Sequence, residues 1–246
     1  MPHRQASTAT RRMLRSFFLL LAAGILSQTA SWAQPVITIG VKDIPPLSQR
    51  DGSGMLDRVL IEAFRRIGRQ VAFAHLPHER SLTEAEAGTI DGDSVRIAGL
   101  EAQYPNLVRV PESMTTYEFT AFAKEGHAGV SNWESLRDQD VGYLIGWKIF
   151  EENVRGATVN KVATARQLFT LLDRGRIAVA LYERRGGEFA IKDMGLTGIR
   201  TLAPPLATRE MYLYLNRKHA ALLPLLAKAL KDMKADGTYA ALTATR

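Results

Sequence analysis

The sequence predicts an α/β fold in which strands and helices alternate along most of the chain. Runs of β-branched residues of strand length are followed by stretches whose apolar residues recur three and four positions apart, as in amphipathic helices. Of the 246 residues, 46% are apolar and 23% are charged, which is enough apolar material for one large domain or two small ones. This order of elements favours parallel sheets with helices on their faces.

The first part of the pattern is a βαβαβ unit. A β-branched strand is predicted over residues 36–41, followed by a loop over 43–54 and a helix over 56–67 that Gly68 can end. The remaining elements are a strand at 70–75, a helix that begins with the capping-box spacing of Ser81 and Glu84 and ends near Gly88, and a short strand at 92–95.

The second part repeats the alternation and suggests a second lobe of modest size. A proline-containing break at 203–206 precedes a last strand and helix, which could complete either lobe. The predicted elements are a capped turn at 131–134, strands at 141–144, 158–162, 177–181 and 211–215, and helices that begin near Trp147 and cover 164–174 and 222–235.

The first 33 residues have the features of a cleaved secretory signal peptide. Arg11, Arg12 and Arg15 precede an apolar run over residues 17–26, and a small-x-small cleavage site ends at Ala33. This run is too short for a membrane span, which needs roughly 20 apolar residues. We therefore expect a periplasmic protein with the peptide removed near Ala33, and the choice between the Sec and twin-arginine routes stays open.

Charge and cysteine content restrict the function classes. The net charge is +7, but residues 1–33 hold four arginines and no acidic residue, which leaves 28 basic against 25 acidic residues, or +3. Nucleic acid is therefore not an expected partner. The absence of cysteine from the sequence excludes disulfides, thiolate metal ligands, cysteine nucleophiles and a lipidated cysteine.

Residues 88–97, GTIDGDSVRI, concentrate polar chemistry in one short stretch. We expect Asp91 to be structural at the turn that leaves the helix. Asp93, Ser94 and Arg96 are expected near the carboxyl end of the strand, where open α/β sheets place ligands. Asp91 and Asp93 are two apart on the predicted strand, and we expect strand alternation to point their side chains to opposite faces. We therefore predict neither a metal site nor a catalytic acid pair here.

Arg96 is the first candidate for a ligand anchor. A guanidinium can bind a carboxylate through two charge-assisted hydrogen bonds, which fix orientation as well as adding energy. The alternative is a surface ion pair of Arg96 with Asp93 or Glu101. Arg80, at another strand-to-helix junction, is a second candidate, or else a solvated residue at a helix start.

Three other junctions supply further candidates for ligand binding. Gly146 and Trp147 lie between a strand and a helix, where free backbone N–H groups attract anions. The Trp147 indole could stack on a ligand or close the cleft, and the alternative is packing between lobes. Tyr117 on a hinge strand, and Tyr182 with Glu183 after a strand of the second lobe, are weaker candidates.

A metal site is not expected at His75, His78 and Glu79. These residues lack a fourth ligand at useful spacing, and Pro77 separates the two histidines. We instead interpret this stretch as a loop at the rim of a ligand site, with one of its polar groups facing the ligand. The sequence also predicts no cofactor and no catalytic residue.

Four stretches occur in an informative order. They are Asp43-Ile44-Pro45-Pro46-Leu47 after the first strand, EAGTIDGD at 86–93, VGYLIGWK at 141–148, and residues 171–180 with Arg174-Gly175-Arg176. Together they resemble the periplasmic solute-binding proteins of the amino-acid-transport type, the family-3 extracellular solute-binding proteins, over nearly all of the chain after the signal peptide.

The resemblance implies a two-lobed, periplasmic-binding-protein-like α/β fold of type II. Each lobe would be a mainly parallel sheet flanked by helices, with two hinge crossovers between them. Lobe one would comprise residues 34–120 and 208–246, and lobe two residues 121–207. Asp43 and Pro46 would belong to the ligand-binding loop after the first strand.

Two departures from the family pattern bear on the ligand. Ala178-Val179 stands where the family usually has Asp-Ala, and the acidic position that holds a ligand ammonium is Glu183. The turn before the carboxylate-binding arginine is shortened to residues 93–96. The resemblance therefore supports the fold more directly than it supports an amino acid as ligand.

These features lead to the hypothesis of a periplasmic protein that binds a small polar solute, an amino acid or another carboxylate, between two lobes and closes by hinge motion. A monomer would deliver the solute to an inner-membrane ABC-type permease or dock on a sensor. Two alternatives stay open. One is a periplasmic enzyme resembling cyclohexadienyl dehydratase, with Glu183 or Asp93 as general acid or base. The other is a sensory or accessory module that binds a partner protein.

Overall fold

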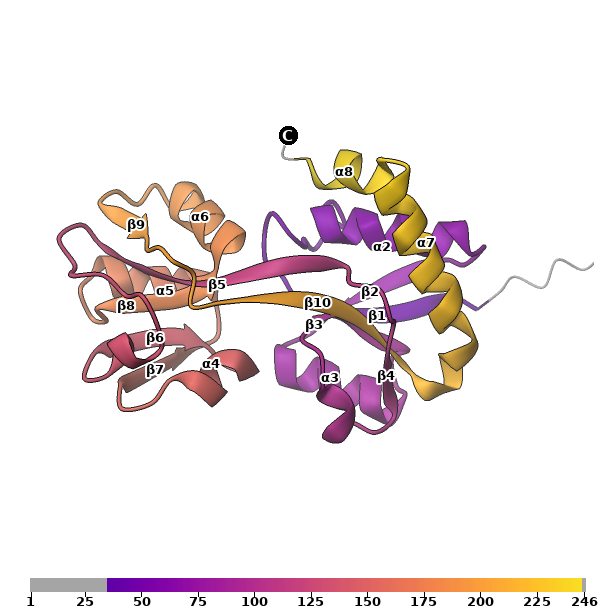
Figure 1. Cartoon of the computed structure of the whole chain (residues 1–246), viewed down its shortest axis with the longest axis horizontal. Coiled ribbons are helices and arrows are strands. Elements are labelled where there is room, and N and C mark those ends of the chain that lie inside the picture. The colour runs from indigo at the N-terminus through magenta and orange to yellow at the C-terminus, as the bar shows by residue number, and fades with distance from the viewer. Residues whose placement is uncertain (1–34, 245–246) are drawn as a thin grey trace, which may run out of the picture. The chain divides into compact units, whose positions relative to one another are not determined.

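The computed structural model describes residues 35–244, shown as a ribbon in Figure 1. The predicted signal peptide at 1–33 lies outside the described residues. Among those residues no helix is long and apolar enough to cross a membrane. The strands form one hydrogen-bonded path in the order β2-β1-β3-β10-β5-β8-β6-β7, with β4 added on β10 and β9 added on β5.

The predicted two-lobed α/β fold is confirmed, and each lobe is built on three parallel strands. In lobe one, β1 pairs with β2 and β3 in parallel, and in lobe two β6 pairs in the same way with β7 and β8. Lobe one contains β1 Ile37–Val41, α2 Met55–Arg66, β2 Val71–His75, α3 His78–Ala87, β3 Gly92–Arg96, η1 Leu100–Ala102, β4 Leu107–Arg109, η3 Arg217–Leu222, α7 Leu223–Ala235 and α8 Thr238–Thr243. Lobe two contains η2 Glu134–Leu136, β6 Asp140–Leu144, α4 Lys148–Asn153, β7 Thr158–Val162, α5 Ala165–Asp173, β8 Val179–Glu183, α6 Arg184–Asp193 and β9 Ile199–Thr201.

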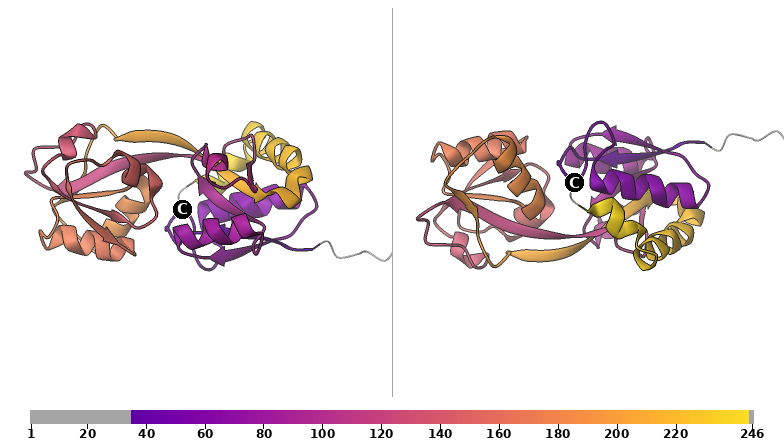
Figure 2. Two further views of the ribbon diagram at one scale, coloured as in Figure 1. Left: turned by 90° about the horizontal axis from the view of Figure 1, so that it is seen from below. Right: turned by 90° about the horizontal axis from the view of Figure 1, so that it is seen from above.

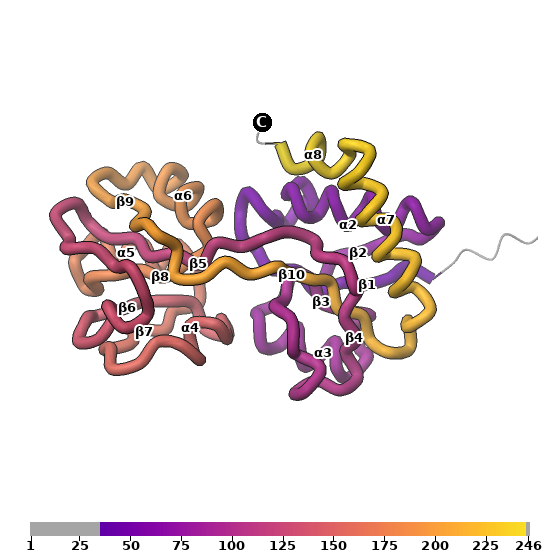
Figure 3. The backbone as a smooth tube through the Cα atoms, viewed as in Figure 1, coloured from indigo at the N-terminus to yellow at the C-terminus, as the bar shows by residue number. Residues whose placement is uncertain are grey.

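Two long strands, β5 Thr115–Lys124 and β10 Ala207–Asn216, connect the lobes. They pair antiparallel from Thr115 opposite Met211 to Phe119 opposite Ala207. Each also pairs with strands of one lobe, β10 with β3 and β4, and β5 with β8 and β9. The smooth tube of Figure 3 and the two further views of Figure 2 show the two strands running side by side. They are the two crossovers that the fold class predicts.

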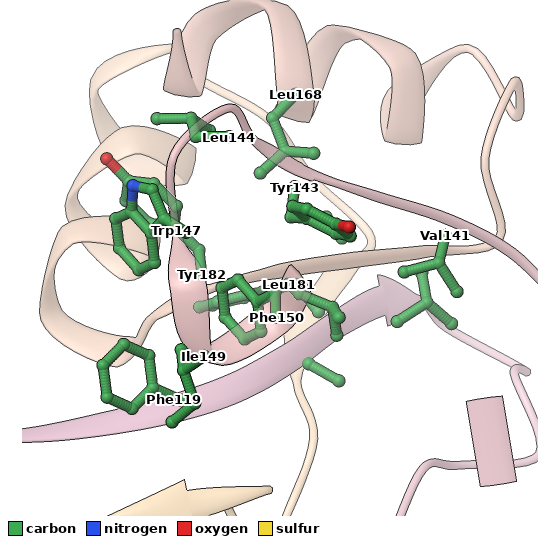
Figure 4. Close-up of a cluster of buried hydrophobic side chains, with 14 of the residues drawn as sticks. Phe119, Val141, Tyr143, Leu144, Trp147, Ile149, Phe150, Leu168, Leu181 and Tyr182 are labelled. Atoms are coloured by element: carbon green, nitrogen blue, oxygen red, sulfur yellow. The ribbon is translucent and has the colours of Figure 1, made fainter. Parts of the chain in front are cut away.

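The apolar core of lobe two is rich in aromatic rings (Figure 4). Phe150 packs edge-to-face on Phe119, with ring centroids 5.7 Å apart, and stacks on Trp147. The same cluster of buried residues continues into lobe one at Ile44 and Leu56. A separate core under α2 and α7 stabilises lobe one. The lobes therefore have their own cores but meet through apolar contacts beside β5.

The amphipathic pattern predicts α2 correctly. Its buried face includes Leu56, Val59, Leu60 and Phe64. The helix ends at Arg66, with Ile67 as the C-cap residue and Gly68 following at φ +69°. Gly68 can adopt this left-handed conformation because it has no Cβ.

The predicted start of α3 at Ser81 is wrong, because the helix begins at His78. Pro77 precedes it with extended backbone and the ring-fixed φ that suits a helix start. Ser81 lies inside the helix, fully buried, and its hydroxyl donates to Asp93 instead of capping. The predicted end is confirmed, since Gly88 closes the helix at φ +78°.

Gly187 allows α6 to approach β5 closely, because a Cβ at this position would overlap the ring of the fully buried Phe122. We expect Gly187→Ala to lower the free energy of unfolding by about 1 to 3 kcal/mol, despite the better helix propensity of alanine. Urea denaturation measures this change. Adding Phe122→Leu should recover part of the loss, and a Gly187→Ala variant as stable as the natural protein would contradict the close approach.

Candidate functional site

Val95 breaks the regularity of β3 at its carboxyl end. Its φ is +59°, a conformation that a β-branched residue rarely adopts. The pairing of β3 with β10 shifts register between Tyr212 and Tyr214, as at a β-bulge. On a regular strand, residues three apart face opposite sides. The irregularity instead allows Asp93 and Arg96 to meet, with Nε of Arg96 donating to Oδ2 of Asp93 at 2.7 Å.

Lys42, Asp93 and Arg96 form a buried charge cluster. Their side chains are 7%, 0% and 8% exposed. Lys42 Nζ donates to Asp93 Oδ1, while Arg96 binds Oδ2. Two cationic side chains therefore share one carboxylate, and the cluster carries an excess positive charge whenever Lys42 is protonated. A buried charge of this kind favours an anionic partner.

Two small residues make room for the charge cluster. Ser81 Oγ donates to Asp93 Oδ1 at 3.0 Å. A Cβ on Gly40 would overlap Ser81 Oγ and would lie 3.1 Å from Asp93 Oδ1. Glycine in β1 and serine in α3 thus allow the Asp93 carboxylate to sit between strand and helix.

The guanidinium of Arg96 is largely occupied within the protein. Its NH2 donates to the carbonyl oxygen of His78 at 2.7 Å, and NH1 lies 3.3 Å from His78 Nδ1. Arg96 has five N–H donors, so one N–H of NH1 is left without a partner among the described residues. The additional contacts of Lys42 Nζ within residues 35–244 are long, at 3.5 Å to Ser81 Oγ and to the Ser94 carbonyl oxygen. Within the charge cluster, the donors still available to a ligand are therefore on Lys42 and on NH1 of Arg96.

Burial shifts the protonation of two residues at this site. Burial and the charge of Arg96 lower the pKa of Lys42 to about 7, although Asp93 partly opposes the shift. Burial, with Arg96 and Lys42 nearby, lowers the pKa of His78 well below its ordinary value. His78 is therefore a neutral imidazole at neutral pH, and its Nδ1 can accept from Arg96.

An apolar cavity adjoins the charge cluster and is lined by both lobes; we call it the inner cavity. Its volume of about 60 Å³ gives room for about four to six water molecules. Lys42, Ser94, Arg96 and His78 form its polar wall. The apolar lining comprises Ile44, Leu56, Leu60, Leu82, Val95, Ile97, Leu100, Tyr117, Phe119, Trp147, Ile149 and Met211; Ser48, Asp57, Gly146 and Lys148 complete it.

A larger, more polar space, the outer cavity, continues from the inner one. Its volume is about 730 Å³, and it shares Lys42, Ile44 and His78 with the inner cavity. Its other lining residues are Asp43, Pro45, Arg50, His75, Leu76, Pro77, Glu79, Leu144, Ile145, Ala163, Thr164, Ala165, Arg166, Tyr182, Gly186, Phe189, Ala190, Asp193 and Met194.

Trp147 is the principal aromatic residue that lobe two contributes to the inner cavity. Its indole stacks on Tyr182 at 4.8 Å and on Phe150 at 5.5 Å between ring centroids (Figure 4). The buried Nε1–H has no acceptor among the described residues. A buried donor without a partner costs roughly 1 to 3 kcal/mol, so an acceptor atom on a ligand would stabilise this wall.

The lobes touch where α3 and α4 begin. The His78 ring meets Trp147 edge-on at 5.5 Å between centroids, and Lys148 Nζ pairs with Glu79 Oε2 at 3.0 Å. A Cβ on Gly146 would lie 2.9 Å from His78 Cβ. Gly146, at φ +80°, therefore permits an approach that a side chain would block.

The structure brings five of the predicted ligand-binding residues to the inner cavity. These are Ser94, Arg96, Tyr117, Gly146 and Trp147. Asp93 lies behind the polar wall of the inner cavity and binds both Lys42 and Arg96.

The other predicted ligand-binding residues are more scattered. Asp43 and Tyr182 line the outer cavity. Arg80 points to solvent with a 68% exposed side chain and pairs with Glu84 at 2.6 Å. Pro46 follows a cis peptide bond after Pro45 and lines neither cavity.

Glu183, the proposed general acid or base of the enzyme hypothesis, lies outside both cavity linings. Its carboxylate accepts from Gly186 N at 2.8 Å and caps α6, and it pairs with Arg185 at 3.3 Å. Burial raises the pKa of Glu183, and the hydrogen bond from Gly186 opposes this shift.

Sequence reasoning missed Lys42, and it placed His78 only on a loop rim, without its contact with Arg96. Lys42 directly follows β1, so the rule that places ligands at the carboxyl ends of parallel strands could have found it. The loop rim that contains His78 was noted in the sequence, but its spacing from Arg96 gives no signal that the two residues contact each other.

Comparisons with known proteins agree with the architecture. No family model matches the chain. An uncharacterized protein of Shewanella oneidensis is 22% identical over 190 residues, 74% of this chain and 71% of that protein. A histidine kinase sensor domain with similarity to periplasmic binding proteins superposes with a TM-score of 0.74 at 19% identity, over 85% of this chain and 95% of the other. The GluR0 ligand-binding core in complex with L-glutamate gives a TM-score of 0.76 at 10% identity, over 86% and 97%.

These similarities define the class of fold. Substrate-binding proteins of amino acid ABC transporters are among the other solved structures that share it. The chain has the type II periplasmic-binding-protein fold, as the sequence predicts. Sequence identities of 10% to 19% extend this conclusion to the fold alone.

Proposed function

We propose that this protein binds a small carboxylate-bearing solute in the inner cavity, between its two lobes. The charge cluster carries the proposal, because two cations that share one carboxylate lie in the wall of a largely apolar cavity. A ligand carboxylate would bind Lys42 Nζ and the remaining N–H of Arg96 NH1. Ligand sites in proteins commonly combine such an apolar lining with a few convergent polar groups.

The fold supports the same proposal. The GluR0 core, which has this fold, binds L-glutamate, and an ancestral arginine-binding protein with this fold was solved with glutamine. A ligand that contacts both lobes would favour their closed arrangement. Lys42 and Arg96 would hold it from lobe one, and Trp147 and the start of α4 from lobe two.

We further propose export to the periplasm and a membrane partner. An ABC-type permease would receive the solute, as the likeness to transporter substrate-binding proteins suggests. A second candidate is a sensory module, favoured by the likeness to a histidine kinase sensor domain. Solute uptake in a deletion strain distinguishes them: loss of uptake supports the permease, and loss of a transcriptional response with normal uptake supports the sensor.

Arg96→Gln should weaken carboxylate binding about tenfold, because it removes one charge-assisted hydrogen bond worth roughly 1.5 kcal/mol. A thermal-shift panel of carboxylates, amino acids and neutral sugars identifies the ligand, and calorimetry then measures Kd. Arg80→Gln is the matched control and should leave Kd unchanged, since Arg80 pairs with Glu84 in solvent. Stabilisation by neutral sugars but by no carboxylate would contradict the proposal.

A further inference from the structure

We infer that the inner cavity selects a carboxylate with an apolar body and no ammonium group, so that amino acids are not its preferred ligands. This inference rests on the proposed function and names its substrate class. It depends on which acidic groups, which donors and which surfaces the cavity offers a bound molecule.

The carboxylate in the inner cavity lining is already committed to the protein. Among the described residues of this lining, Asp57 is the acidic one. It accepts from Ser48 Oγ at 2.5 Å, from Gln49 N at 2.8 Å and from Gly54 N at 3.1 Å. These bonds tie the loop after β1 to the start of α2. Asp93, behind the wall, is likewise held by Lys42, Arg96 and Ser81.

The acidic residues of the outer cavity are paired as well. Asp43 binds Arg50 at 3.0 Å, Glu79 binds Lys148 at 3.0 Å, and Asp193 binds Arg166 at 3.3 Å. An ammonium entering either cavity would therefore have to share a carboxylate that already has a partner within the protein.

The excess charge of the cluster opposes an α-ammonium directly. In an α-amino acid the ammonium is attached to the carbon next to the carboxylate. Anchoring the carboxylate on Lys42 and Arg96 would therefore bring the ammonium close to two cations in a buried, weakly screened place.

The remaining surfaces suit apolar groups and hydrogen-bond acceptors. Leucine, isoleucine and aromatic side chains line most of the inner cavity. The Trp147 ring already stacks on Phe150 and Tyr182. Its Nε1–H, which lacks an acceptor in the part of the chain that the structure describes, is a donor that repels an ammonium and attracts a carboxylate, keto or hydroxyl oxygen. Three independent features of the cavity thus favour the same class of ligand.

Two matched ligand pairs test this inference on the mature protein by calorimetry: 4-methyl-2-oxopentanoate against leucine, and 3-phenylpropanoate against phenylalanine. Members of a pair share the carboxylate and apolar body, and one of them lacks the ammonium. We expect the ammonium-free member of at least one pair to bind tenfold or more tightly than its partner.

The outcomes separate this inference from the proposed function. Equal or tighter binding of leucine and phenylalanine would overturn the selection against ammonium and leave carboxylate binding intact. If small polar carboxylates such as glutamate bind and none of the four ligands binds, the inferred preference for a ligand with an apolar body would be wrong. If no carboxylate binds at all, the proposed function itself fails. Asp57→Asn is the control variant: a selective loss of amino acid binding in it would identify Asp57 as an ammonium acceptor and would contradict our assignment.

Discussion

Asp93→Asn is expected to lower the free energy of unfolding by about 3 kcal/mol. The substitution keeps the shape of the side chain but removes the one negative charge between Lys42 and Arg96, all three of which are buried. Breaking a buried ion pair by neutralising one partner typically costs about 3 to 5 kcal/mol, because the other charge stays buried without compensation. The lower figure applies here because Lys42, with a pKa of about 7, can lose its proton and reduce the repulsion.

Urea denaturation at pH 7 measures the effect, and a double-mutant cycle assigns its origin. Combining Asp93→Asn with Lys42→Met should recover more than 1 kcal/mol, since the second change removes one uncompensated cation. Asp140→Asn, at an exposed position of β6, is the control and should change stability by less than about 0.5 kcal/mol. A loss below 1 kcal/mol for Asp93→Asn would show that the cluster does not depend on its carboxylate.

The different roles of Asp91 and Asp93 were predictable, but strand alternation is not their cause. Residues two apart on a regular strand share a face. The two side chains separate because Asp91 precedes β3 and turns away, accepting from Thr38 N at 2.8 Å and pairing with Lys218 and His219. Its structural role follows from its place at the exit of α3, which the helix-ending Gly88 makes visible in the sequence.

The buried position of Arg96 was not predictable from the sequence. Ser94-Val95-Arg96 contains no glycine or asparagine to signal a positive φ, yet Val95 adopts one. Without this irregularity, alternation along β3 would place Arg96 on the side opposite Asp93. From the sequence, a surface ion pair of Arg96 and a role as an unpaired ligand anchor are therefore equally reasonable predictions. Tertiary packing against β10 decides the outcome, and a local pattern cannot report it.

Helix α6 was missed for a related reason. Arg184-Arg185-Gly186-Gly187 has low helix propensity and is typical of a loop. The helix forms because Glu183 caps its first turn and because the two glycines allow close packing. The same cap explains why Glu183, a ligand-binding candidate in the sequence, is 1% exposed and engaged within its own lobe.

Carboxylate binding is expected to weaken about fivefold between pH 7 and pH 8 and about fiftyfold between pH 7 and pH 9, because the protonated fraction of Lys42 falls from about one half to about one hundredth. Lys42 must carry its proton to attract the ligand, and in the empty site its pKa lies near 7. A bound carboxylate raises that pKa by adding a negative charge. Binding therefore takes up about half a proton at pH 7 and close to one proton at pH 8 to 9, as long as the pKa of Lys42 in the complex lies higher still. The affinity falls as the pH rises through this interval.

The surroundings of Lys42 make it the group responsible for this dependence. Asp93 of β3 binds Lys42, and the nearby charge of Arg96 acts on it. Ser81 of α3 also contacts it but does not titrate, and His78, at the start of α3, is already neutral because burial lowers its pKa well below its ordinary value. Calorimetry at pH 6 to 9, in buffers of different ionisation enthalpy, measures both Kd and the protons taken up. Lys42→Arg keeps the positive charge over this whole range and should make binding independent of pH. A Kd of the natural protein that stays constant from pH 6 to pH 9 would exclude Lys42 from the ligand contact and leave Arg96 as the anchor.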